Sequence, residues 1–283
     1  MSLVEEAEKI GGTPAVFTFQ PHPLEVLEGE APPKLLTQQS KEEAIRHLGV
    51  KVLLLVPFTL ELASLSPEQF IETVLVRELS VNSVYVGYNY TFGQGSRGTA
   101  ETLLQGGQRH GFKVCVTPPV TMDGSPVSST LIRNLLAQGE VAAAGNLLGY
   151  YPFVDGVVVE GERRGRTLGF PTANIHLQEG VMVPANGVYA VQVQIDQDDY
   201  LGVANIGVKP TFIENNPRAN LEVHLLDFQG ELYGKRIRVF IHRRIRGEKR
   251  FSSPIELVEQ INMDINQARS VWPIRINRGS NII

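Results

Sequence analysis

The sequence predicts an α/β domain followed by an all-β domain, an antiparallel barrel that carries a terminal helix. Two observations support this fold class. Helix-like and strand-like segments alternate up to about Gly149, and short strands separated by turns dominate from Tyr150 onward. The length of 283 residues fits two domains. We therefore expect a first domain over residues 1–148 and a second over residues 149–283.

The first half alternates its segments as a Rossmann-like domain does. The run from Val50 to Val56, apolar at every position except Lys51, is typical of a strand that is buried on both faces of a parallel sheet. Gly49 is placed to cap the helix before that run. We expect helices over 4–10, 41–48, 67–79 and 103–110, and strands over 15–19, 50–56, 83–86 and 113–117.

The second half consists of short strand-like segments. Asp198-Asp199 and Gln229-Gly230 are typical of hairpin turns. One helix follows, with Ser253 as its N-cap and Pro254 in its first turn. Apolar residues recur along this helix at helical spacing, which predicts that it packs on the barrel. The expected strands cover 157–160, 187–195, 200–206, 221–226 and 237–242.

Composition limits the classes of function. Hydrophobic residues make up 42% and charged residues 20% of the chain, which is enough for folded cores. The formal net charge of -4 argues against a protein whose main role is to bind nucleic acid. The one cysteine, Cys115, predicts a core thiol and a reducing compartment. Neither a signal peptide nor a segment of membrane-spanning length is recognisable. We expect a cytoplasmic monomer or weak oligomer that acts on small molecules.

Residues 161–174 combine the groups that phosphoryl transfer requires. Three glycines allow the backbone to approach a ligand closely, and three arginines supply charge that suits phosphate. Thr172 and Asn174 are two residues apart, so on an extended segment both side chains face the same way. Together they could hold one Mg²⁺ while ATP phosphates and water complete its coordination. The alternative is a Gly/Arg-rich hairpin turn in which both are ordinary turn residues.

A carboxylate follows on a later strand. In the expected strand over 221–226, Leu221 and Val223 face one side, whereas Glu222 and His224 face the other. The pattern alone describes Glu222 as a solvated carboxylate on the outside of a barrel. An RNA-binding barrel is a further alternative, suggested by the arginines within 163–166 and 243–246 and disfavoured by the acidic net charge.

The stretch from Arg164 to Ile175 resembles the Gly-Arg-x-Leu-Gly-Phe-Pro-Thr-Ala-Asn pattern of the riboflavin kinase family. Segments over 203–212, 221–228, 232–235 and 246–251 resemble later parts of that family, so the resemblance covers nearly all of 149–269. It implies a six-stranded barrel that phosphorylates riboflavin to FMN with Mg-ATP. By the same resemblance, Glu222 takes the proton from the ribityl hydroxyl, and Thr172 and Asn174 hold Mg²⁺.

The resemblance also implies ligand contacts. His224 receives no role from it and is interpreted as structural. A flavin- or nucleotide-binding protein without turnover is the alternative, and the presence of Thr172, Asn174 and Glu222 together speaks against it. Phosphate contacts would come from Gly165, Arg166, Thr167 and Gly169, and flavin contacts from Phe170, Pro171 and Arg246.

Three segments of the first half resemble the FMN adenylyltransferase half of bacterial bifunctional riboflavin kinase/FAD synthetases. They are Thr18–Pro23, the glycine-rich stretch Val86–Gly98, and Val127–Arg133, where a helix begins. Each has a simpler interpretation: a rigid turn at Pro21-His22-Pro23, a flexible surface loop, and an N-cap at Ser128. The implied nucleotide and flavin contacts are Pro21, His22, Pro23, Asn89, Phe92, Ser128, Ser129, Thr130 and Arg133.

One family motif has no counterpart in the first half. The family carries a first strand and a Gly-x-Phe-Asp-Gly-x-His-x-Gly-His pattern, and His22, His47 and His110 lack its spacing. We expect the first domain to be shorter than the family's by a few tens of residues and to lack a central strand. We also expect FAD formation by this polypeptide to be weak or absent.

Overall fold

The computed structural model describes residues 3–161, 164–209 and 218–271, without side chains at 164, 166, 208, 209 and 218. These residues form two compact units, which are described separately below. The first contains residues up to 32 and residues 41–127, and the second contains residues 33–40 and residues from 128 onward. Packing therefore groups the segment 128–148 with the barrel. The expected modules over 1–148 and 149–283 remain a prediction.

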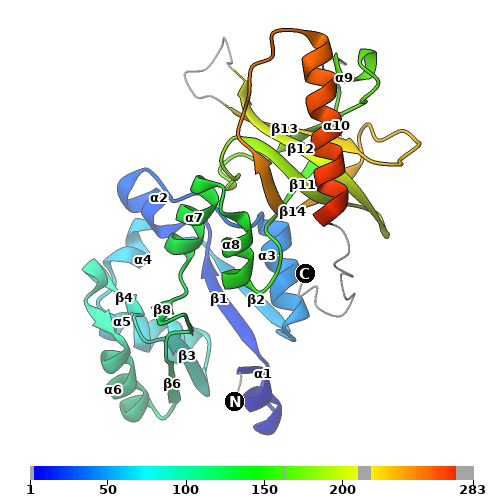
Figure 1. Cartoon of the computed structure of the whole chain (residues 1–283). Coiled ribbons are helices and arrows are strands. Elements are labelled where there is room, and N and C mark those ends of the chain that lie inside the picture. The colour runs from blue at the N-terminus through cyan, green and yellow to red at the C-terminus, as the bar shows by residue number, and fades with distance from the viewer. Residues whose placement is uncertain (1–2, 162–163, 210–217, 272–283) are drawn as a thin grey trace. The chain divides into compact units, whose positions relative to one another are not determined.

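The first unit contains two pairs of parallel strands with helices around them (Figure 1). Strand β1 (Ala15–Phe19) pairs with β2 (Val52–Val56), and β3 (Ser83–Gly87) pairs with β6 (Lys113–Thr117). The parallel pairing confirms the α/β class. The remaining elements are α1 (Leu3–Lys9), α2 (Pro23–Glu28), α3 (Gln38–His47, which begins within the second unit), α4 (Leu60–Ser64), α5 (Pro67–Phe70) continued by a π-helix (Ile71–Glu78), a 3₁₀ turn (Gln94–Ser96), α6 (Ala100–His110), and the short strands β4 (Thr91–Phe92), β5 (Gly98–Thr99), β7 (Thr121–Met122) and β8 (Ser125–Pro126).

Two expectations about this unit were wrong. The apolar strand β2 is not buried on both faces, because Val52 and Leu55 are each 38% exposed. A sheet of two strands supplies too few neighbours to cover both of its faces. Cys115 is half-buried rather than in the core. The core of the unit instead gathers around Phe70, Leu103 and Phe112.

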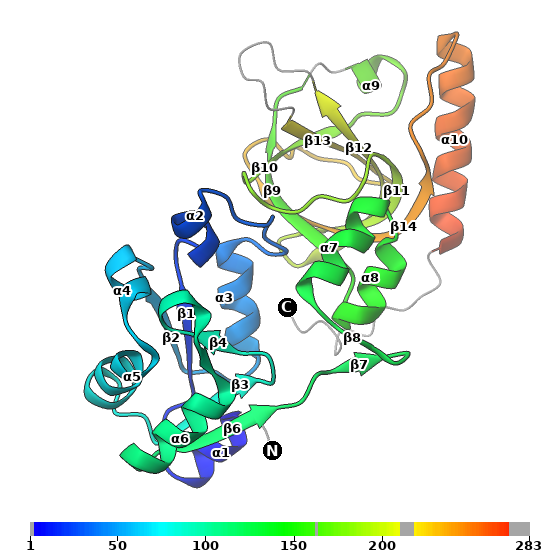
Figure 2. The same ribbon diagram turned by 90° about the vertical axis from the view of Figure 1, so that its left-hand side faces the viewer.

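The second unit is built on a closed barrel of six antiparallel strands, as the sequence predicted. The strand order around the barrel is β10-β13-β12-β11-β14-β9. Figure 2 shows the long helix α10 (Pro254–Val271) along the outside of the barrel, and Ser253 caps it with a bond of 3.2 Å to the Glu256 N–H. The strands are β9 (Phe153–Val159), β10 (Ala173–Leu177), β11 (Gly187–Ile195), β12 (Asp198–Lys209), β13 (Arg218–Leu225) and β14 (Arg236–Arg246), and the other helices are α7 (Ser129–Gln138), α8 (Val141–Leu148) and α9 (Arg164–Thr167).

Alternation along the strands separates the barrel interior from its surface. Leu221 and Val223 are fully buried inside, whereas Glu222 and His224 face outward. Strand β11 is buried on both faces because α10 covers its outer side. Glu222 and His224 of β13 therefore lie on the outer wall of the barrel, on which α10 also packs.

The two predicted hairpin turns were misplaced. Asp198 and Asp199 belong to β12 and pair with Ile195 and Gln194. The turn comes earlier, at Asp196, whose φ of 57° supplies the left-handed backbone that the turn needs. Gln229-Gly230 lies in a longer connection from β13 to β14, strands that are not neighbours in the barrel.

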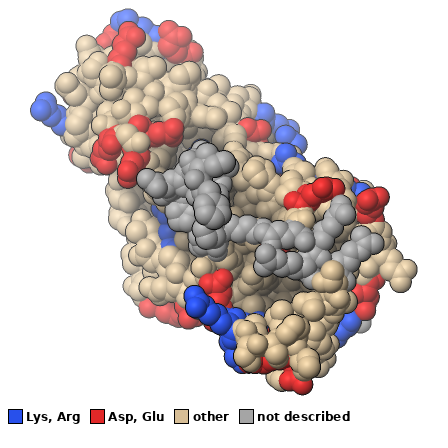
Figure 3. All heavy atoms as spheres, turned by 90° about the horizontal axis from the view of Figure 1, so that it is seen from above, with Lys and Arg blue, Asp and Glu red and all other residues tan. Residues whose placement is uncertain are grey.

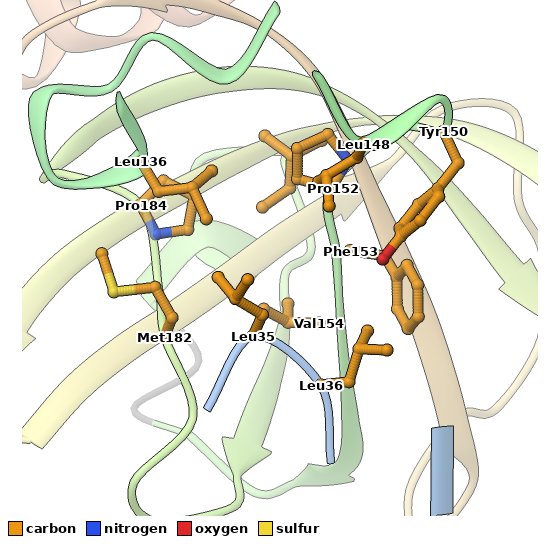
Figure 4. Close-up of a pocket in the computed structure, with 11 residues that line it drawn as sticks. Leu35, Leu36, Leu136, Leu148, Tyr150, Pro152, Phe153, Val154, Met182 and Pro184 are labelled. Atoms are coloured by element: carbon orange, nitrogen blue, oxygen red, sulfur yellow. The ribbon is translucent and has the colours of Figure 1, made fainter. Parts of the chain in front are cut away.

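Residues 33–40 pack on the barrel unit. The Lys34 N–H donates to the Gly180 carbonyl at 2.8 Å, and the Met182 N–H donates to the Lys34 carbonyl at 2.7 Å. Figure 4 shows the side chains of Leu35 and Leu36 among apolar residues of the barrel unit, including Val154 and Met182. Residues 33–40, although they lie in the first half of the chain, therefore form part of the packing of the second unit.

Within the described ranges, no helix is both long and apolar enough to cross a bilayer. On the face of the molecule seen in Figure 3, acidic and basic side chains are scattered among other residues.

Candidate active site on the outer wall of the barrel

A pocket of about 340 Å³ opens on the outer wall of the barrel. Three parts of the second unit enclose it: the outer faces of β11 to β14, the segment that follows α9, and α10 with the residues that lead into it. Apolar and charged side chains meet in it, as is usual for small-molecule sites. The lining residues are Gly165, Leu168, Phe170, Thr172, Val188, Val203, Asn205, Glu222, His224, Arg246, Glu248, Lys249, Phe251, Leu257, Ile261 and Asp264.

Strand register lines up a row of polar side chains across this wall. Glu222 is paired with Asn174 on one side and with Asn205 on the other. Directly paired residues of antiparallel strands place their side chains on the same face, at a Cβ separation of about 5 Å. The row continues to Val188 and then to Arg246. The predicted base therefore lies between two amide side chains.

Glu222 is half-buried, and the Asn220 amide donates to its Oε1 at 2.9 Å. The outward orientation that the strand pattern predicted is correct. The Glu222 side chain nevertheless faces the pocket rather than open solvent, because α10 and the segment after α9 also line that pocket. A carboxylate in this position can accept a proton from a hydroxyl bound in the pocket.

The segment from Gly165 to Thr172 folds back on itself. The N–H groups of Leu168 and Phe170 both donate to the Gly165 carbonyl, at 3.1 and 2.8 Å. A Cβ at position 165 would lie 2.3 Å from the Phe170 carbonyl oxygen, so only glycine fits there. This compact turn brings Phe170 and Thr172 to the pocket.

Asn174 lies beside the pocket and is 8% exposed. A Cβ at position 161 would lie 2.0 Å from its amide nitrogen, so Gly161 leaves the space that the amide occupies. Thr167 and Gly169 are exposed, and Pro171 is exposed as well. The Arg166 side chain, predicted to contact phosphate, lies outside the described residues.

Arg246 lines the pocket, and its charge is already paired. Its guanidinium donates to both carboxylate oxygens of Asp264 on α10, with a shortest distance of 2.8 Å. Asp264 is 2% exposed and also accepts from the Gln260 amide at 3.0 Å. The guanidinium lies 5.6 Å from the centre of the Phe251 ring. Arg246 thus connects the end of β14 to α10 and supports the wall that α10 contributes.

The neighbouring Arg244 has a structural role. It donates to the Asn186 carbonyl at 2.6 Å and to the Gln138 carbonyl at the end of α7. Two of the three arginines within 243–246 are therefore engaged inside the unit, which weakens the RNA-binding alternative. Around 163–166, the arginine side chains lie outside the described residues.

Sequence reasoning missed the half of the pocket that comes from distant segments. Phe251, Leu257, Ile261 and Asp264 belong to α10 and its approach, and periodicity predicted only that this helix packs on the barrel. Asn205 could have been found, because it follows the outward-facing alternation of its strand, as His224 does.

The oxygen atoms of Thr172, Asn174 and Glu222 are of the type that binds a hard cation. Thr172 and Asn174 offer neutral oxygens, and Glu222 offers a carboxylate beside Asn174. Oxygen ligands of this kind suit Mg²⁺, which keeps several waters or phosphate oxygens of its own. Among the described residues, no group of three or more His, Cys, Asp or Glu side chains could hold a metal ion. A cation here would consequently depend on substrate oxygens.

Comparison with known proteins gives the same assignment for both halves of the chain. The sequence model of the riboflavin kinase family matches residues 148–272, and that of FAD synthetase matches residues 1–131. A bifunctional riboflavin kinase/FMN adenylyltransferase of Bacillus subtilis is 41% identical over 93% of this chain and 83% of its own length. The chain belongs to this bifunctional family.

Further relatives of the riboflavin kinase/FMN adenylyltransferase family extend the match. The proteins of Pseudomonas fluorescens and Escherichia coli are each 39% identical over 95% of this chain and 86% of their own length. A crystal structure from Streptococcus pneumoniae, described as a macrolide-efflux protein, has a TM-score of 0.86 and 34% identity over 94% of this chain and 86% of that one.

The predicted adenylyltransferase residues of this family member fall in both compact units. In the first, His22 follows β1 and caps α2, with its Nδ1 accepting from the Leu24 N–H at 3.2 Å, and Pro21 and Pro23 flank it. Asn89 is exposed after β3, whereas Phe92 is 7% exposed in the core, stacked on Tyr90. The simpler interpretation of a turn at Pro21-His22-Pro23 describes this geometry. A flexible surface loop, the simpler interpretation of Val86–Gly98, does not describe the buried Phe92.

The third predicted segment belongs to the barrel unit. Ser128 caps α7 by accepting from the Leu131 N–H at 3.2 Å, as the N-cap interpretation described. Ser129 and Thr130 form its first turn, and Arg133 donates to the Pro33 carbonyl at 2.7 Å. Any role of these residues in binding a nucleotide remains a prediction.

Proposed function

We propose that the barrel pocket transfers the γ-phosphoryl group of ATP to the terminal ribityl hydroxyl of riboflavin, which yields FMN and ADP. The observation that supports this most is the position of Glu222, on the pocket wall and paired in register with Asn174. Membership of the bifunctional family supports the same reaction. Flavin cofactor biosynthesis is therefore the process in which the chain acts.

The reaction balances with the groups present. The ribityl oxygen attacks the γ-phosphorus, an O–P bond forms, and the bond from that phosphorus to the β–γ bridging oxygen breaks as ADP leaves. Glu222 accepts the hydroxyl proton. Thr172 and Asn174 are proposed to hold Mg²⁺, which would offset negative charge on the phosphates when bound.

The two sides of the pocket suit the two substrates. The apolar side, with Phe251, Leu257 and Ile261, fits a flat ring system such as isoalloxazine. The opposite side carries the turn from Gly165 to Phe170, whose predicted phosphate contacts are Gly165, Arg166, Thr167 and Gly169. Phe170, Pro171 and Arg246 stay proposed as flavin contacts, with Arg246 acting from its ion pair with Asp264.

The decisive experiment is chromatography of flavins after incubation with riboflavin, ATP and Mg²⁺. We expect FMN from the unmodified chain. We expect Glu222→Gln to lower kcat by about 10²- to 10⁴-fold while riboflavin binding is kept, because the amide cannot take the proton. Unchanged turnover in Glu222→Gln would remove Glu222 as the base, and the absence of FMN from the unmodified chain would favour a binding protein.

Glu231→Gln is the matched control. Glu231 is an exposed carboxylate on the connection from β13 to β14, outside the residues that line the pocket. We expect its removal to leave FMN formation unchanged. The same chromatogram measures FAD, and the expectation that this polypeptide forms little FAD remains a prediction. The proposal also keeps the expected setting: a cytoplasmic monomer or weak oligomer acting on small molecules, without nucleic acid or membrane.

A further inference from the structure

His224 lies on the polar outer wall of the barrel, and no function has been assigned to it so far. It follows Glu222 by two residues, so both side chains project from the same face of β13, and it lines the same pocket. Its Nδ1 lies 2.8 Å from the Pro171 carbonyl oxygen. Its ring meets the Phe170 ring edge to face, with centroids 5.6 Å apart. His224 therefore contacts the segment that carries Thr172 at two successive residues.

The contact falls where the strand ladder stops. Strands β10 and β13 are paired as far as Ala173 and Val223. Continuing that register by one pair places Thr172 opposite His224, but Thr172 is outside the ladder. Pro171 cannot extend the ladder as a donor because it has no backbone N–H. The imidazole instead supplies a donor from β13 to the Pro171 carbonyl.

The carbonyl partner defines the state of the ring. A carbonyl oxygen only accepts, so Nδ1 must carry the hydrogen, and in the neutral ring Nε2 is then the acceptor. The contact is compatible with both the neutral and the protonated imidazole, since both can donate from Nδ1. What it requires is a donor at the position of Nδ1, on a side chain short enough to reach the backbone of the neighbouring segment.

We propose that His224 is a positioning residue, which holds the Phe170–Thr172 segment against β13 and thereby keeps Thr172 at the pocket that Glu222 lines. The proposal rests on the proposed function, because it concerns the oxygens that would hold the metal-nucleotide complex. Strand β13 then has two roles. Glu222 acts on the hydroxyl, and His224 fixes the distance from that base to the segment on the other side of the pocket.

Two substitutions separate the hydrogen bond from the packing of the ring. His224→Asn places an amide N–H where Nδ1 stood, so it retains the donor. His224→Phe keeps an aromatic ring against Phe170 and removes the donor. We expect His224→Phe to weaken Mn²⁺ binding in the presence of ADP by about tenfold or more, as the loss of a group that orients metal ligands does. We expect His224→Asn to stay within about threefold of the unmodified chain.

The binding measurement is the free Mn²⁺ signal in electron paramagnetic resonance, titrated with protein and ADP. Steady-state kinetics accompany it: His224→Phe should lower kcat and raise the KM for ATP, while the KM for riboflavin stays near that of the unmodified chain. Equal losses in His224→Asn and His224→Phe would overturn the proposal, and so would unchanged Mn²⁺ binding in His224→Phe. If the unmodified chain forms no FMN, the proposed function fails, whereas the Mn²⁺ comparison still decides the role of His224.

A measurement on the unmodified chain tests the same proposal even if a His224 variant does not fold. Nitrogen-15 labelling of histidine distinguishes the Nδ1–H tautomer from the Nε2–H tautomer in long-range proton–nitrogen correlation spectra. We expect the neutral His224 ring to be the Nδ1–H tautomer. An Nε2–H tautomer could not donate to the Pro171 carbonyl, and its observation would overturn the proposal without any substitution.

Discussion

Glu222 is oriented by its neighbours on the barrel wall as well as by its own strand. The Asn220 amide donates to its Oε1 at 2.9 Å, from a residue two positions earlier on the same face of β13. Hydrogen bonds to a carboxylate are stronger than those between neutral groups. The hydrogen bond from Asn220 restrains the orientation of the Glu222 carboxylate, which can still accept a proton.

Replacing Asn220 tests this restraint. We expect Asn220→Ala to lower kcat for FMN formation by about fivefold to tenfold, because a charge-assisted hydrogen bond to the base is lost. The KM values should change less than kcat. Asn262→Ala is the control, since the Asn262 amide binds the Val258 carbonyl along the exposed side of α10. A similar fall of kcat in both variants would show a general effect on the fold.

His242 carries a pH dependence of stability rather than of catalysis. It lies on β14, its ring centroid is 4.0 Å from that of Tyr151, and its buried Nε2 has no hydrogen-bond partner among the residues that the structure describes. Burial lowers the pKa of His242 to about 4. Because the folded state keeps the ring neutral, the unfolded chain binds the proton first as the pH falls below about 6.5. Stability is therefore complete above that pH and is lost progressively toward pH 4.

We expect the free energy of unfolding to fall by about 1.4 kcal/mol more in the unmodified chain than in His242→Phe between pH 7.5 and pH 5.5. Urea unfolding followed by circular dichroism at the two pH values measures the difference. His176→Asn, at an exposed position on β10, should behave as the unmodified chain does. An equal pH dependence in His242→Phe would mean that the buried ring is not the source.

At the scale of elements, two ion pairs among the described residues connect α10 to the barrel unit in different surroundings. Asp264 is buried where it binds Arg246 beside the pocket, with the Asp264 side chain 3% exposed. Asp227 and Arg269 form a pair at 2.9 Å near the C-terminal end of α10, and their side chains are 74% and 48% exposed. Breaking a buried pair leaves an uncompensated charge, whereas an exposed pair contributes little.

We expect Asp264→Asn to destabilise the barrel unit by about 3 kcal/mol and to raise the KM for riboflavin, because Arg246 and the wall of Phe251, Leu257 and Ile261 lose their support. Asp227→Asn should cost less than about 1 kcal/mol and leave that KM unchanged. Urea unfolding and flavin kinetics on both variants measure this. Equal effects of the two substitutions would contradict a supporting role for the buried pair.

The same elements explain how far sequence could predict the site. The alternation along β13 predicted which side Glu222 faces, because alternation is a local property of the chain. The local motif over residues 161–174 singled out Thr172 and Asn174, whose metal-binding role remains a prediction. Asp264 and Phe251 were missed because tertiary packing decides which residues of α10 and of the segment before it face the pocket. The misplaced turn has a related cause: three aspartates fall within residues 196–199, and the inward packing of Ile195 places the turn at the first of them, Asp196.

At the scale of the whole chain, the least predictable feature was the contribution of residues 33–40 to the barrel unit. Ser40 is fully buried and donates to the Asp155 carboxylate on β9, which Arg238 on β14 also binds, at 2.8 Å. Gln39 accepts from Arg236 at 2.8 Å. Partners that are more than 100 residues apart leave no local pattern in the sequence, so periodicity could not assign this segment to the second unit.

This attachment predicts a selective loss of protection. We expect Ser40→Ala to speed the hydrogen exchange of amides in β9 and β14 by about tenfold, because the buried Asp155 carboxylate loses one of its donors. Exchange in β3 and β6 of the first unit should not change. Thr59→Ala, which removes the N-cap of α4, is the reciprocal control and should affect the first unit alone. If Ser40→Ala left β9 and β14 as protected as before, the segment would lie on the barrel without stabilising it, and the second unit would owe its stability to residues from 128 onward.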